Sequence, residues 1–104
     1  MTNQRPETSA RDIADKDRQL SALMRAARAF DALDQRVQAV LSDSSRGRVR
    51  VACVNGRQLV LAAESPAWAT RARLEADTCL QTARQVWPQD ITSVKVIVQH
   101  RPGD

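Results

Sequence analysis

Six arginines lie in a short part of the chain that contains one acidic residue. Residues 46–73 hold these six arginines against Glu64 alone, which gives this segment a net charge of +5. A guanidinium group can bind two phosphate oxygens at once and can stack on an exposed base. The segment therefore predicts binding to nucleic-acid phosphates or to an acidic protein surface. The residues expected to bind nucleic acid are Arg46, Arg48, Arg50, Arg57, Arg73 and Lys95.

A structural role for the same arginines is the alternative. Cationic side chains on the open face of a sheet also protect it against aggregation. The local imbalance favours the binding interpretation. Residues 1–45 carry seven basic and seven acidic groups, so the whole net charge of +4 comes from residues 46–104.

The residue types needed for catalysis are scarce. His100 is the single histidine and lies near the C-terminus without a nucleophile pattern beside it. Asp12, Asp15 and Asp17 lack the glycine turn and the final glutamate of a calcium loop. The three glycines form no phosphate-binding loop or dinucleotide fingerprint. We therefore expect a protein that is not an enzyme, with no cofactor, no metal and no small-molecule substrate.

The two cysteines and the hydropathy pattern indicate a location. Cys53 and Cys79 lie among apolar neighbours in an expected strand and an expected helix, and both are predicted to be core thiols. No apolar run approaches the roughly 20 residues of a membrane span, and the polar N-terminus lacks the apolar segment of a secretory signal. We expect a cytoplasmic protein without a membrane partner, associated with the nucleoid if it binds DNA.

The N-terminal part is expected to end in a long helix. Residues 1–17 are polar and are predicted to be a disordered tail, or a frayed extension of that helix. From residue 18 to residue 43, apolar residues recur at steps of three and four, which predicts an amphipathic helix with one buried stripe. That stripe includes Leu20, Leu23, Met24, Phe30 and Leu33.

A hairpin follows. Residues 48–54 alternate, with Val49, Val51 and Cys53 expected on the buried face. Asn55-Gly56 predicts a type I′ turn, and residues 57–63 are the paired strand.

The second helix is expected over residues 65–87. Ser65 is a good N-cap and Pro66 suits the first helical position, while Pro88 ends the helix. Trp68, Thr70, Arg71 and Leu74 lie near its start, where an aromatic ring, an arginine and an exposed leucine could contact a partner protein. For Trp68, core packing is favoured over base stacking, because this residue falls on the apolar side of the helix.

Residues 91–100 complete the chain as a third strand, with Val94, Val96 and Val98 facing inward. The order α-β-β-α-β predicts an α+β, KH-like fold with a three-stranded sheet and two helices on one of its faces. The open face is expected to present Arg48, Arg50 and Lys95 around Val60 and Ile97. The expected core combines Leu23, Phe30, Val51, Trp68, Leu80 and Val96.

The segment S-P-A-W-A-T-R-A-R at residues 65–73, with the hairpin sequence R-V-A-C-V-N-G-R-Q-L-V-L-A-A-E before it, resembles the DciA family of bacterial replicative-helicase loaders. The resemblance extends from about Leu20 to Gln99, and the domain is expected over residues 18–101, with 102–104 as its C-terminal end. The helix opening, from Ser65 to Arg73, is its specific part.

This resemblance implies a KH-like domain that binds single-stranded DNA and the replicative helicase DnaB, and that assists helicase loading in DNA replication. The sequence lacks the G-x-x-G loop that clamps nucleic acid in KH domains, so arginines would have to take that role. Two alternatives stay open: a KH-like RNA-binding module, and a dimerising protein-interaction domain that binds no nucleic acid.

Overall fold

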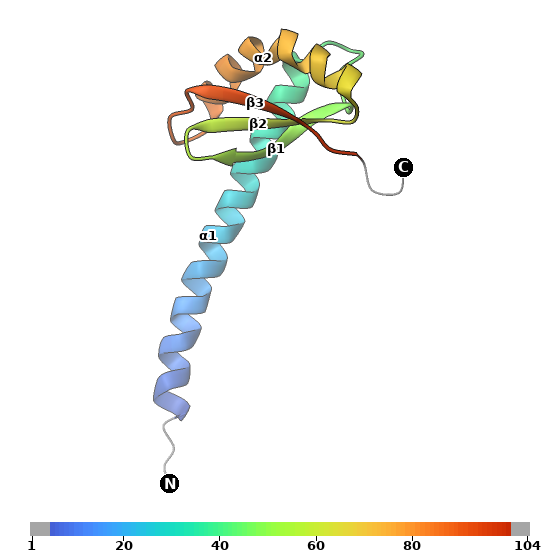
Figure 1. Cartoon of the computed structure of the whole chain (residues 1–104). Coiled ribbons are helices and arrows are strands. Elements are labelled where there is room, and N and C mark those ends of the chain that lie inside the picture. Colours follow the sequence, from blue (N-terminus) through green and yellow to red (C-terminus); the bar gives the residue numbers. More distant parts are fainter. Residues whose placement is uncertain (1–4, 101–104) are drawn as a thin grey trace.

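The chain forms a small α+β body from which one long helix projects (Figure 1). The structure is a computed structural model that describes the backbone of residues 5–100 and the side chains of residues 13–100. The elements are α1 (Arg5–Val40), β1 (Val49–Asn55), β2 (Gln58–Ala63), α2 (Pro66–Val86) and β3 (Ser93–Val98). The expected order α-β-β-α-β and the KH-like α+β class are confirmed.

The three strands form a mixed sheet in the order β1-β2-β3. β1 and β2 are an antiparallel hairpin, while β3 runs parallel to β2 after the crossover through α2. Leu59, Leu61 and Ala63 of the central strand join the core, together with the C-terminal part of α1 and the inner side of α2. Both helices therefore cover the same face of the sheet, and the other face is free of helices.

The second helix has the ends that its sequence predicts. The side chain of Ser65 accepts a hydrogen bond from the Trp68 amide, Pro66 is the first helical residue, and the helix is capped at Trp87. The residues at its buried positions have small side chains, among them Ala69, Ala72 and Ala83. Small residues let α2 lie close to the sheet and to α1.

The first strand contains a β-bulge, which the predicted alternation of its residues did not include. The pairing changes between Val51, which lies opposite Leu61, and Cys53, which lies opposite Val60. Because one extra residue reverses the alternation, Val54 packs on the core while Cys53 is exposed on the open face. The expectation that Cys53 is a core thiol is therefore wrong, whereas Cys79 is buried as predicted.

The hairpin turn also differs from the prediction. Asn55 still pairs with Gln58 as part of the ladder, so the two turn residues are Gly56 and Arg57. Gly56 has a φ of +63°, and no non-glycine residue of the described chain has a positive φ. The type I′ turn centred on Asn55 and Gly56 is therefore wrong. A positive φ at the first turn residue alone is the pattern of a type II′ turn.

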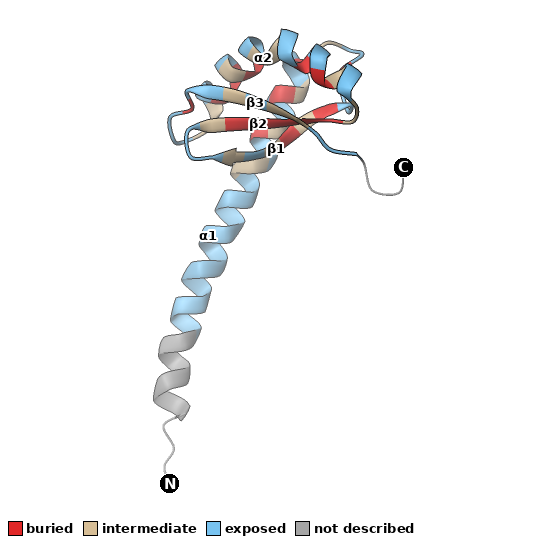
Figure 2. Cartoon of the chain, in the orientation of Figure 1, coloured by how far each residue is buried: buried red, intermediate tan, exposed pale blue. Residues whose placement is uncertain are grey.

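The first helix is much longer than expected and mostly uncovered. It begins at Arg5, within the residues 1–17 for which a disordered tail or a frayed extension of the helix was predicted, and residues 1–4 lie outside the described part. Leu33, Val37 and Leu41 are buried, but Leu23 is 67% exposed. Figure 2 shows the same contrast, because the part of α1 that is coloured by burial is exposed until the helix reaches the sheet. Leu23 is therefore not a core residue. The other five expected core residues are in the core or packed against it.

Candidate nucleic-acid interface

The helix-free face of the sheet has an apolar centre with polar and basic side chains around it. In the observed register, Arg50, Ala62 and Ile97 form one row across the three strands, and Cys53, Val60 and Lys95 form another. Val60 and Ala62 are buried although no helix covers them. Long side chains from the two outer strands therefore shield the central strand.

One of these shielding contacts is explicit. The guanidinium Nη2 of Arg50 donates a hydrogen bond of 3.0 Å to Oε1 of Gln99, just beyond the end of β3. Since Arg50 starts on β1, its side chain crosses the central strand. Gln99 was not among the predicted site residues. Its outward orientation was predictable from the alternation in β3, but its contact with Arg50 required the strand order.

The other predicted nucleic-acid residues lie in different places. Arg57 is exposed in the turn at the end of the hairpin, and Lys95 is exposed on β3. Arg73 is exposed on α2, in the helical layer, so it cannot share one flat surface with Arg50 and Lys95. Arg50 and Lys95 therefore share the helix-free face of the sheet on its two outer strands, and Arg57 lies in the hairpin turn at one end of the same sheet.

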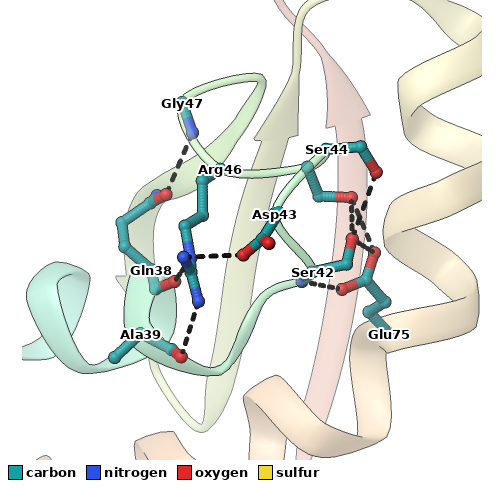
Figure 3. Close-up of polar contacts among 9 residues, drawn as sticks. Gln38, Ala39, Ser42, Asp43, Ser44, Arg46, Gly47 and Glu75 are labelled. Atoms are coloured by element: carbon teal, nitrogen blue, oxygen red, sulfur yellow. Dashed lines mark hydrogen bonds and ion pairs between the residues drawn. The ribbon is translucent and has the colours of Figure 1, made fainter.

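Arg46 serves the fold. Its guanidinium donates to the carbonyl oxygens of Gln38 and Ala39 and forms an ion pair of 2.9 Å with Asp43 (Figure 3). Carbonyl groups in the last turn of a helix lack backbone partners, so a cation there is doubly favourable. Arg46 closes the C-terminus of α1.

Arg48 lies at the edge of the sheet, against α2. Its guanidinium is 5.7 Å from the centroid of the Trp68 ring and 3.3 Å from Oε1 of Glu64. The alternation along the strand predicted that Arg48 lies on the open face around Val60 and Ile97. That prediction is wrong, because Arg48 lies beside Trp68 and Glu64. Because Arg48 lies over the ring of the half-buried Trp68, a base or a partner could stack there only by displacing it.

A polar cluster fixes the loop between α1 and β1 to α2 (Figure 3). Glu75 of α2 accepts hydrogen bonds from the Ser42 amide at 2.6 Å and from Ser45 Oγ at 2.6 Å. Arg71 lies 3.7 Å from the same carboxylate and also donates to Ser44 Oγ. Arg71, predicted as a partner contact, thus also holds this loop, while Leu74 beside it is 79% exposed.

The charge of Glu75 is stabilised by this cluster. Burial alone would raise the pKa of its carboxyl, but the hydrogen bonds from Ser45 and Ser42 and the charge of Arg71 outweigh burial and lower the pKa below its ordinary 4.5. Burial and the nearby charge of Glu75 raise the pKa of Cys79 to about 11, so that thiol stays protonated.

We expect Glu75→Gln to remove a pH-dependent part of the stability. A lowered carboxyl pKa stabilises the fold above the ordinary pKa, and this contribution is lost as the pH falls through the folded-state pKa. The variant should be about 1–2 kcal/mol less stable than the wild type at pH 7, and this difference should shrink below pH 4.5. Urea unfolding at several pH values measures it. Asp77→Asn, at an exposed carboxylate of the same helix, is the control. A difference that stays constant with pH would contradict the role given to the charge.

The described residues contain neither a cluster of metal-binding side chains nor a helix that could span a membrane. Among them, no group of histidine, cysteine, aspartate and glutamate is arranged to hold a metal ion. In the same part of the chain, no helix is long and apolar enough to cross a membrane.

The chain has the α-β-β-α-β order of a KH-like α+β fold, and Arg50 and Lys95 lie on the helix-free face of its sheet. Comparison with protein families gives a more specific assignment: the family model described as Dna[CI] antecedent, DciA, matches residues 9–96. The chain therefore belongs to the DciA family, a family of replication proteins associated with the DnaB helicase, of the helicase-loader type and not known as enzymes. A comparison with curated proteins found no match.

Proposed function

We propose that this protein binds single-stranded DNA on the open face of its sheet and binds DnaB through the outer side of α2, and that it helps to load the helicase during replication. The observation that carries the DNA part is the placement of Arg50 and Lys95 on one face. They start on opposite outer strands, and the Arg50 guanidinium crosses to Gln99 beyond the end of β3, so both cationic groups lie beside the apolar centre formed by Val60, Ala62 and Ile97.

The composition of this face indicates how DNA would bind. No aromatic side chain is on it, so sequence-independent contacts to the phosphates account for most of the affinity, and Ile97 supplies an apolar surface beside the bases. Gln99 holds the guanidinium of Arg50 across the sheet and leaves its remaining donors for a phosphate. Arg57 extends the basic track to the hairpin turn. Arg46 and Arg48, which have structural partners, and Arg73, which lies on α2, are left out of this track.

The helicase part rests on the family and on one surface. Leu74 is a large apolar side chain exposed on α2, and Arg71 is one turn away at the junction with the α1–β1 loop. Thr70 lies one residue before Arg71, and its hydroxyl donates to the Pro66 carbonyl. An apolar anchor beside a cation is typical of a protein contact. This surface is in the helical layer, so DNA and helicase can be bound at the same time.

A pair of substitutions tests the helicase surface. Arg71→Ala combined with Leu74→Ala should weaken capture of DnaB by on the order of 10-fold or more, since it removes an apolar anchor and a cation. Binding to a single-stranded oligonucleotide should be unchanged. The measurement is a pull-down of purified DnaB at increasing concentration, with circular dichroism to verify the fold.

Gln81→Ala combined with Arg84→Ala is the matched control, because both residues are exposed further along α2. If the control variant captures DnaB as weakly as the Arg71 and Leu74 variant does, the contact with DnaB lies elsewhere on the helix. If the Arg71 and Leu74 variant loses both partners while it stays folded, one shared surface binds DNA and helicase, and the division proposed here is wrong.

The RNA-binding alternative is tested with an RNA of the same sequence, which should bind no more tightly than DNA.

A further inference from the structure

The projecting part of α1 carries an apolar stripe that the domain itself leaves uncovered. Ile13, Leu20, Leu23 and Met24 are 58%, 55%, 67% and 48% exposed. With 100° per residue, these four, together with the exposed Ala27 and the half-buried Phe30, fall within an arc of about 120°. A helix in water gains most of its stability from packing an amphipathic face, and this segment has no such packing against the part of the chain that the structure describes.

We propose that this stripe binds the same stripe of a second copy of the chain, with the two α1 helices antiparallel. Antiparallel alignment overlaps the stripes fully when Ile13 of one chain lies opposite Phe30 of the other. In this register Leu20 lies opposite Leu23, so two identical leucine pairs form the centre. The stripe ends at Phe30, where α1 begins to pack on its own sheet.

Lys16 decides between the two possible directions. It lies in the middle of the apolar arc, about 60° from Ile13. In a parallel pair of helices its ammonium group would face the Lys16 ammonium of the second copy inside the seam, and burying two like charges is costly. In the antiparallel register it lies opposite Ala27. That small side chain leaves room for the lysine stem, and Asp31 follows one turn further along the helix.

The border of the stripe also favours the antiparallel pair. Asp17 and Arg28 are exposed on the same side of the stripe, at about 40° and 60° from Ile13. Antiparallel helices bring the same border of the two copies together. Asp17 of each copy then lies about two residues, or about 3 Å along the axis, from the level of Arg28 of the other copy. The long arginine side chain spans this offset, which gives two symmetric ion pairs.

The test is self-association measured by sedimentation velocity over a range of protein concentrations. We expect the wild type to show a concentration-dependent dimer, and Leu23→Asp to raise its dissociation constant by on the order of 100-fold, because each dimer loses two central leucines. Leu74→Asp is the matched control, since it changes an exposed leucine outside the stripe. A wild type that stays monomeric at all concentrations, or equal weakening by the control, would overturn the proposal.

Charge exchange tests the direction of the helices. Asp17→Arg and Arg28→Asp should each weaken the dimer, because each creates two like-charge contacts. The doubly substituted chain should dimerise as the wild type does. A mixture of the two single variants should also form a heterodimer, since one chain then carries two cations and the other two anions at these positions. If neither the double variant nor the mixture restores the dimer, the antiparallel arrangement is wrong. DNA and DnaB binding do not enter these measurements, so the proposed function is tested separately.

Discussion

Replacing Arg50 and Lys95 together by glutamate is expected to weaken binding to a single-stranded oligonucleotide by on the order of 100-fold at low salt. The two side chains are the cations on the outer strands of the open sheet face, and the change reverses the sign of the local field. The slope of log affinity against log salt should also become shallower by about 1.4, because each contact to a single-strand phosphate contributes about 0.7. Fluorescence anisotropy at several salt concentrations measures both quantities.

Arg73→Glu combined with Arg84→Glu is the matched control for this experiment. It makes the same change in net charge, but both residues are exposed on α2. A comparable loss of affinity in the control would mean that DNA responds to the overall charge of the domain, and the sheet face would then not be the binding site. Affinity of the wild type that does not respond to salt would exclude the phosphate mechanism altogether.

The order of the elements was predictable because each boundary has its own local signal. Ser65 and Pro66 start α2, Pro88 follows its end, and valine recurs at every second residue of β3. These signals depend on a few neighbouring residues, and tertiary structure did not override them. The bulge at Ala52 has no such signal. A single inserted residue changes the face of Cys53 and Val54 without changing the apolar composition of the strand.

The candidate site was predictable only in part, because a charge cluster in sequence becomes several surfaces in space. Arg46, Arg48 and Arg50 are two residues apart, yet the first caps α1, the second contacts Trp68 and Glu64, and the third crosses the open sheet face. The alternation along β1 placed Arg50 correctly. It could not show the helix end beside Arg46 or the indole beside Arg48, which come from other elements.

The apolar stripe of α1 shows a further limit of periodicity. Steps of three and four predict that one side of the helix is apolar, and Leu23 and Leu33 both fit this pattern. They do not show how far along the helix the sheet extends. Leu33 lies where α1 crosses the sheet and is fully buried, whereas Leu23 lies about 15 Å further out and is exposed.

Leu33→Ala and Leu23→Ala are therefore expected to have very different effects on the stability of the monomer. Leu33→Ala should lower the free energy of unfolding by about 3–5 kcal/mol, because it leaves a cavity between α1, the sheet and α2. Leu23→Ala should change it by less than about 0.5 kcal/mol, since the side chain is already in water and alanine favours the helix. Urea unfolding at a protein concentration below that of self-association measures both. Equal destabilisation by the two variants would mean that the stripe packs on its own domain over its whole length. The projection of α1 from the domain and the proposed antiparallel dimer would then both be contradicted.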